Sequence, residues 1–277
     1  MRYITIIIAL MVTLLPMHEV AAQHTLGVSF GAGTGSFRPY PDQETRTISG
    51  LFTGGASWRY YTDQRYVGAI GIDVEFMERA YSYAPYASYT LEGEEHAYYT
   101  RYWNSIMVPF VWQPHVYMFH NHVRVFLDLG VTFSYNMAST YENEAYRDLG
   151  WDEWEGDYEY KTARDNRFCY GLMGGAGINY IIGRYEIMAR ARYYFGYSDI
   201  LKNRNKYYNN SNDGAENPFY YTPTRSPVDN MMISVGLNYR LGSGDGFASW
   251  YKKREEKVKI GTDFNYSGAS NKNSKRK

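Results

Sequence analysis

The sequence is short of several things that mark familiar classes of protein. It has one cysteine, Cys169, in 277 residues, which excludes a disulfide within the chain and a cysteine-based zinc site. Its 29 basic and 29 acidic residues cancel, which argues against nucleic-acid binding through bulk charge. Past residue 22 the longest apolar run, 106–112, has seven residues, whereas a membrane-spanning helix needs about 20. We therefore expect no nucleic-acid partner, and no membrane-spanning helix after residue 22.

The first 22 residues have the layout of a secretory signal peptide. Arg2 supplies a positive charge, residues 4–15 form a mostly apolar run of twelve, and Val20-Ala21-Ala22 is a small-residue cleavage site. Twelve helical residues rise about 18 Å, which is short of the roughly 30 Å hydrocarbon core of a bilayer. We expect residues 1–22 to be removed and the protein to leave the cytoplasm of a Gram-negative cell.

The mature chain alternates apolar and polar residues with a period of two. It is rich in glycine (26) and tyrosine (31), a composition that suits β structure. The clearest alternation, from 231 to 241, predicts a strand. The same pattern, more weakly in the first half of the chain, covers 24–37, 48–60, 67–80, 98–113, 123–136, 167–180 and 185–196. These eight strands have 11 to 16 residues, more than the usual 5–6 or so and enough to cross a bilayer at a tilt.

The two faces of the predicted strands differ as a membrane barrel requires. One face is apolar in the middle and aromatic at its ends, as Tyr185 and Tyr197 show for one strand, and this is typical of a lipid-facing wall. The other face carries charges among small residues. We expect a charge network in the lumen, made of Arg59, Asp73, Glu75, Arg79, Arg101, Arg124, Asp128, Glu186, Arg190, Arg192 and Arg240.

The predicted fold is all-β, an eight-stranded antiparallel up-and-down transmembrane β-barrel over residues 23–241. A soluble barrel with a solvated charged face is the alternative. Connections alternate between short (61–66, 114–121, 181–184) and long (38–47, 81–97, 137–166, 199–228). Outer-membrane barrels have short periplasmic turns and long extracellular loops, so we expect the long connections to face outward.

The long connections carry aromatic residues that could recognise a partner. The candidates are Trp151, Trp154, Tyr158, Tyr220 and Tyr221. The alternative is that these loops are solvated and pack only on themselves. The segment 137–165 is also acidic, with nine Asp/Glu against three Lys/Arg.

The closing strand and the segment after it carry two further signals. Ser234, Gly236, Tyr239 and Leu241 have the spacing of the insertion signal that the barrel-assembly machinery reads on terminal strands. Residues 242–277 follow, with nine Lys/Arg against four Asp/Glu. We expect them to be a basic, flexible tail, placed in the periplasm because the number of strands is even.

A family resemblance follows from three motifs in order. These are Val108-Pro109-Phe110, the run GLMGGAG at 171–177 and the run ARYYFGYSDI at 191–200. Together they resemble the outer-membrane β-barrel family that includes PorT-like proteins, small eight-stranded barrels, over residues 24–241. The resemblance implies the barrel fold and, for PorT itself, a part in protein export by the type IX system. The shared residues build the barrel, so they carry over the fold and not the mechanism.

The histidines of the chain do not form a clear catalytic or metal-binding pattern. His96, with Ser82 and Ser88 in the same long connection, lacks the spacing of a triad. His115, His120 and His122 cluster in a short connection without a nearby carboxylate or cysteine, which favours a polar turn over a metal site. We expect no catalytic residue, cofactor or metal.

The sequence therefore predicts a non-enzymatic outer-membrane barrel that presents loops outward, as an accessory in secretion or surface assembly. The expected partners are outer-membrane lipid, the barrel-assembly machinery during insertion, and an extracellular or periplasmic protein. A small pore or ligand-binding barrel is the alternative, and an enzyme acting at the outer rim is a more distant one.

Overall fold

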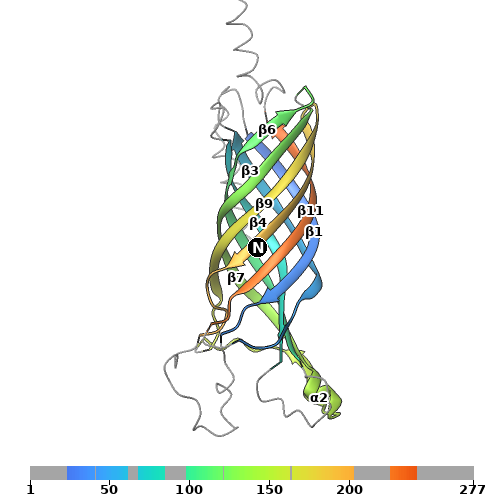
Figure 1. Cartoon of the computed structure of the whole chain (residues 1–277), viewed down its shortest axis with the longest axis vertical. Coiled ribbons are helices and arrows are strands. Elements are labelled where there is room, and N and C mark those ends of the chain that lie inside the picture. Colours follow the sequence, from blue (N-terminus) through green and yellow to red (C-terminus); the bar gives the residue numbers. More distant parts are fainter. Residues whose placement is uncertain are drawn as a thin grey trace, which may run out of the picture.

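The computed structural model describes residues 24–40, 42–61, 68–84, 98–120, 122–162, 164–202 and 225–241. In these ranges eight long strands wind into a closed barrel (Figure 1). The strands are β1 (His24–Phe37), β3 (Ile48–Tyr61), β4 (Ala69–Tyr83), β5 (Tyr99–Gln113), β7 (Val123–Asn143), β9 (Phe168–Ile182), β10 (Tyr185–Gly196) and β11 (Val228–Leu241).

Each long strand pairs antiparallel with the next one along the chain, and β11 pairs with β1 to close the barrel. In the closing ladder His24 lies opposite Leu241 and Phe37 opposite Val228. The first strand therefore begins at the same end of the barrel at which the last strand ends. The predicted all-β, eight-stranded, up-and-down architecture is confirmed.

Shorter elements decorate the two ends of the barrel. They are β2 (Thr45–Arg46), β6 (His115–Met118), α2 (Glu144–Asp148), the 3₁₀ turn η1 (Asp152–Trp154) and β8 (Glu155–Asp157). The expected short connection at 114–121 contains β6, which pairs with β7 as a hairpin. No helix in the described part of the chain is long and apolar enough to cross a membrane.

The expected upper limit of 16 residues per strand is wrong for β7. This strand has 21 residues and ends at Asn143 instead of 136. Its additional residues stay in the sheet because Tyr99 of β5 lies opposite Asn143, and a register shift between Trp103 and Ser105 lets the ladder continue. Part of the expected long loop 137–166 is therefore a projecting sheet.

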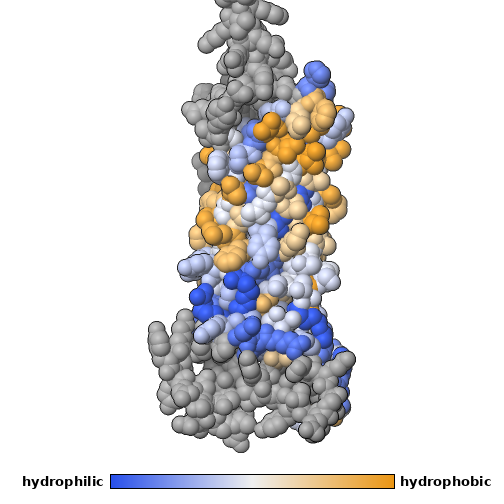
Figure 2. Space-filling model, in the orientation of Figure 1, coloured by the Kyte–Doolittle hydropathy of each residue, from blue (hydrophilic) through white to orange (hydrophobic). Residues whose placement is uncertain are grey.

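The alternation seen in the sequence becomes an outside and an inside. Outward side chains are apolar and exposed, for example Leu127 and Ile233. Inward ones are mostly polar, small or sulfur-containing, with some large apolar ones such as Phe126 and Trp103. The twelve residues of β10 give about 40 Å of strand, which at the usual tilt of about 40° spans roughly 30 Å. Figure 2 shows apolar residues over the part of the barrel nearer β6 and polar ones toward the opposite end.

Glycines on the inner face make room for the large charged side chains. A Cβ added to Gly175 would meet the side chain of Arg192, and one added to Gly71 would meet that of Arg59. A Cβ on the neighbouring outward residue, Gly174, would meet nothing within 4 Å. The run of glycines in β9 therefore belongs to the packing of a full lumen.

Candidate functional site

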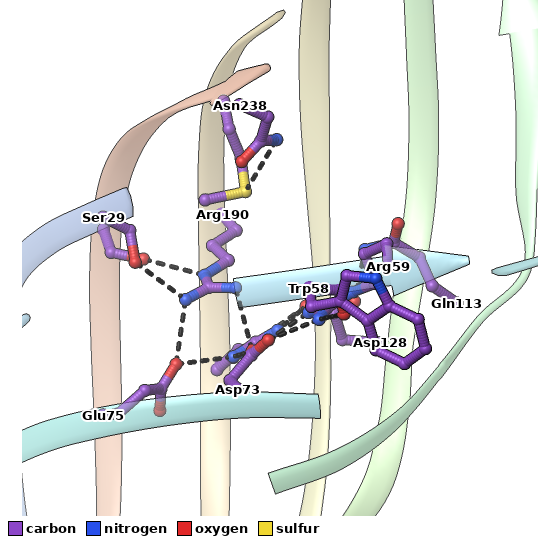
Figure 3. Close-up of polar contacts among 12 residues, drawn as sticks. Ser29, Trp58, Arg59, Asp73, Glu75, Gln113, Asp128, Arg190 and Asn238 are labelled. Atoms are coloured by element: carbon purple, nitrogen blue, oxygen red, sulfur yellow. Dashed lines mark hydrogen bonds and ion pairs between the residues drawn. The ribbon is translucent and has the colours of Figure 1, made fainter. Parts of the chain in front are cut away.

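Charged side chains meet in layers inside the lumen, which they share with buried apolar residues such as Met77, Met107 and Met173. The largest layer, which we call the central cluster, consists of Arg59, Asp73, Glu75, Asp128, Arg190 and Arg192 (Figure 3, in which Arg192 is not labelled). These residues come from β3, β4, β7 and β10, so the cluster ties together distant parts of the wall. Its three arginines balance its three carboxylates.

Asp73 is the hub of the central cluster. Its Oδ2 accepts from Arg59 Nη2 at 2.9 Å and from Arg192 Nη1 at 2.7 Å, and its Oδ1 accepts from Arg59 Nη1. Arg190 Nη1 lies 3.4 Å from the same Oδ2. Three guanidinium groups therefore share one carboxylate whose side chain is 0% exposed. Such a burial is tolerated only because the charges are paired and hydrogen-bonded.

Neutral side chains bond several further polar atoms of the central cluster. Gln113 Nε2 donates to Asp128 Oδ1 at 2.8 Å, and the Tyr194 hydroxyl donates to Glu75 Oε2 at 2.6 Å. Arg190 Nε donates to the Ser234 hydroxyl at 3.1 Å. Directional bonds from all sides fix the positions of the charges.

A second layer, the turn-end cluster, lies toward the short connections and consists of Arg124, Glu186, Arg240 and Asn179. Glu186 Oε1 accepts from Arg124 Nη1 at 3.0 Å and from Arg240 Nε at 2.6 Å, while Asn179 Nδ2 donates to Oε2 at 2.6 Å. The Arg124 guanidinium also lies 4.3 Å from the centre of the Tyr61 ring. This layer fills the lumen between the central cluster and the short connections.

A third layer covers the opposite end, where a segment following β8 folds back over the barrel. Arg101 Nη1 lies 3.3 Å from Asp165 Oδ1, and its guanidinium lies 3.5 Å from the centre of the Tyr158 ring. The Tyr158 hydroxyl donates to Asp165 Oδ1 at 2.7 Å, and burial raises the pKa of that phenol. Tyr158, expected as a recognition residue, is thus engaged at the barrel mouth.

The structure places all eleven residues of the expected lumen network inside, each at most 5% exposed. Nine belong to the central and turn-end clusters, and Arg101 pairs with Asp165. Arg79 has no carboxylate partner among the described residues; its Nε donates to Asn230 Oδ1 at 2.7 Å and its Nη2 to the Val228 carbonyl at 2.8 Å.

Two carboxylates were missed by the sequence reasoning. Asp165 lies in a connection between strands, where no alternation indicates whether a side chain points into the lumen. Asp229 is at an outward position of β11 yet only 2% exposed, because Arg38 Nε (2.7 Å) and the Tyr193 hydroxyl (2.6 Å) both donate to it. The Arg38 guanidinium also stacks on the Phe195 ring at 4.2 Å. Through Arg38 and Asp229 the ends of β1, β10 and β11 are connected at the rim of the barrel.

Apart from Ser234, which bonds Arg190, the other expected residues take no part in the clusters. Trp151 is 52% exposed and Trp154 is half-buried, both beyond the end of the barrel. Tyr220, Tyr221 and His96 lie outside the described residues. The four residues of the expected assembly signal, Ser234, Gly236, Tyr239 and Leu241, lie on β11. Within the described ranges no three His, Cys, Asp or Glu side chains are grouped to hold a metal ion.

Comparison with known proteins gives one family. A protein-family model with the description outer membrane protein beta-barrel domain matches residues 16–202 of this chain. No curated protein matches the chain.

Solved structures that match include Neisserial surface protein A, with 13% identity over 80% of this chain and 100% of that one and a TM-score of 0.39. OprG from Pseudomonas aeruginosa matches with 10% identity over 80% of this chain and 98% of that one, also with a TM-score of 0.39. The Escherichia coli outer membrane protein W matches with 14% identity over 81% and 100%, and a TM-score of 0.32. At these values the neighbours say nothing about what the chain binds.

Proposed function

The chain belongs to the outer membrane protein β-barrel domain family, and on that premise we propose that it is a non-enzymatic, closed barrel that displays its long connections at the cell surface. The observation that carries the proposal is the state of the lumen. The side chains of Asp73, Asp128 and Arg192 are at most 1% exposed, so water does not reach the middle of the barrel. In this proposal the filled lumen passes no solute.

The lumen charges hold the wall rigid and leave function to the ends. Eight strands enclose an interior just wide enough for side chains, and here arginines and carboxylates occupy it in three layers. Because charged side chains pack the middle of the lumen, what the protein offers to a partner in this proposal is its surface outside the membrane.

We assign the end that carries α2 to the extracellular side and the end that carries β6 to the periplasm. The support is the length of the connections, since barrels of this kind have short periplasmic turns. Residues 1–22 are then a signal peptide, and 242–277 a basic tail in the periplasm, because β11 ends beside the start of β1. The tail lies outside the described residues.

Within this function we place the protein with PorT-like accessories of secretion or surface assembly rather than with transporters. The support is the ordered set of motifs that resembles that family, together with a lumen too full to pass a solute. In the structure these motifs lie in β5, β9 and β10 and its end, where they build the wall. An accessory role therefore depends on the surface that the barrel displays.

Conductance in planar bilayers tests the closed lumen. The native protein should show no stable openings. The double variant Arg190→Ala/Arg192→Ala removes two of the three cations of the central cluster and should leak ions, while Arg147→Ala, which removes an exposed guanidinium, should not. Stable openings of the native protein would show a pore instead. A double variant as tight as the native barrel would show that the central cluster is not the plug.

A further inference from the structure

The sheet continues beyond the barrel as a projecting hairpin, residues 138–159, which we call the finger. It consists of the end of β7, α2, η1 and β8, and Figure 1 shows α2 at its far end, away from the barrel. Seven residues past the expected strand end, at about 3.3 Å each, carry β7 roughly 23 Å further. The finger is the largest described feature outside the barrel wall.

The finger is held on both sides along the end of β7. β7 pairs with β5 through Tyr99 and Asn143, and with β8 through Tyr141 and Gly156. The Glu144 carboxylate accepts from the Tyr98 amide at 3.0 Å and from Arg46 Nη1 at 2.9 Å. A surface element held this firmly loses little freedom when it binds, which favours affinity.

The tip of the finger is an ordered apolar knob made of Tyr146, Leu149 and Trp151. The ring centres of Tyr146 and Trp151 lie 4.8 Å apart. The turn between them is closed by the Trp151 amide donating to the Tyr146 carbonyl at 3.0 Å, with Gly150 at φ +71°. Leu149 is 64% exposed and Trp151 52% exposed. Exposed aromatic and aliphatic side chains fixed in place are the usual centre of a protein interface.

Charge surrounds the knob on its own chain. From 142 to 159 there are eight acidic residues and one basic residue, Arg147, a net charge of −7. Most of the acidic positions are exposed. A partner must therefore complement negative charge while offering an apolar pocket, since complementary potentials speed encounter and like charges exclude wrong partners.

We propose that the finger docks a basic protein surface, with the apolar knob inserted into a pocket that is flanked by Lys or Arg of the partner. This inference rests on the proposed display of the α2 end at the cell surface and names the class of partner. A membrane is the less favoured occupant. An anionic leaflet repels a segment of net charge −7. The knob also lies beyond the end of the barrel, on a sheet that is paired on both sides.

Panning a phage-displayed random peptide library against the full protein in nanodiscs tests the proposal. Selected peptides should combine Lys or Arg with apolar residues. Their affinity should fall about tenfold or more on Trp151→Ala and fall between about 0.1 M and 1 M salt, where the Debye length shrinks from about 10 to 3 Å. Asp152→Asn/Glu153→Gln/Glu155→Gln changes the net charge of this segment from −7 to −4 and should weaken binding and reduce its salt dependence.

The matched control is Trp112→Ala, which removes a tryptophan of similar exposure (45%) from the lipid-facing wall and should leave peptide binding unchanged. Selection of acidic or neutral peptides, or of peptides indifferent to Trp151→Ala, would overturn the proposal. So would quenching of a fluorophore on Leu149→Cys by lipids that carry a chain-attached quencher, because it would place the knob in the bilayer.

Failure of this inference and failure of the proposed function give different results. If Leu149→Cys is labelled from outside intact cells but no basic peptide is selected, only the partner class is wrong. If Leu149→Cys is labelled only after the cells are opened, the display itself is wrong and the finger faces the periplasm.

Discussion

Replacing Asp73 by Asn tests the balance of charge inside the barrel. The change keeps the shape of the side chain but removes the carboxylate that Arg59, Arg190 and Arg192 share. Glu75 and Asp128 then face three arginines, which leaves one positive charge uncompensated in a region where no residue of the central cluster is more than 5% exposed. The amide would also turn a donor toward guanidinium donors.

The magnitude follows from burial. Removing one partner of a buried ion pair costs about 3–5 kcal/mol, and Asp73→Asn should lie in that range. The matched control is Asp148→Asn in α2. Its carboxylate lies 3.4 Å from Arg147 Nε, but the two side chains are 65% and 53% exposed, so this loss should be about 0–1 kcal/mol.

Urea unfolding of the protein reconstituted in vesicles, followed by tryptophan fluorescence, measures both free energies. Unboiled gel migration first confirms that each variant is folded. If Asp73→Asn fails to fold, Glu75→Gln perturbs the same cluster at a carboxylate held by Arg190 at 2.9 Å and Arg192 at 2.7 Å. A loss for the buried variants no larger than that of Asp148→Asn would refute the view that the paired charges hold the lumen together.

Three further predictions concern the wall and the end of the chain. Leu127→Arg should destabilise the inserted barrel by about 2–4 kcal/mol, whereas Leu149→Arg on the finger should change the free energy of unfolding little; equal effects would contradict the assigned membrane-facing surface. Gly175→Ala should lower the urea midpoint because its Cβ would overlap a carbonyl oxygen of β10, while Gly174→Ala, with nothing within 4 Å, should not; the reverse ranking would contradict the inside–outside assignment. Deletion of 242–277 should leave assembly intact in pulse-chase gels, and loss of insertion would show that the signal on β11 is misread.

The barrel wall could be predicted because lipid and lumen act on alternate residues. Every residue from Val123 to Tyr135 is constrained by one of the two environments, so period two shows directly in the sequence. The same rule placed Arg124, Asp128 and Glu186 on the inner face. Which arginine pairs with which carboxylate depends on how far neighbouring strands are shifted along one another. The sequence alone does not give that shift.

The finger could not be predicted, because beyond the apolar belt no environment forces alternation. Residues 137–143 stay in a strand only because β5 pairs with them on one side and β8 pairs with 140–142 on the other. Similarly, Asp165 reaches Arg101 through the path of a connection, and Asp229 is buried by the side chains of Arg38 and Tyr193. These contacts are tertiary, so neither composition nor spacing indicates them.

Labelling of single cysteines on intact cells tests the central claim most directly. In a Cys169→Ser background, Leu149→Cys lies at the tip of the finger, and Val116→Cys lies in β6 at the other end of the barrel; the native side chains are both 64% exposed. A membrane-impermeant maleimide should label Leu149→Cys on intact cells and Val116→Cys only after the outer membrane is opened. Labelling of Val116→Cys on intact cells, with Leu149→Cys protected, would contradict the account by placing the finger in the periplasm.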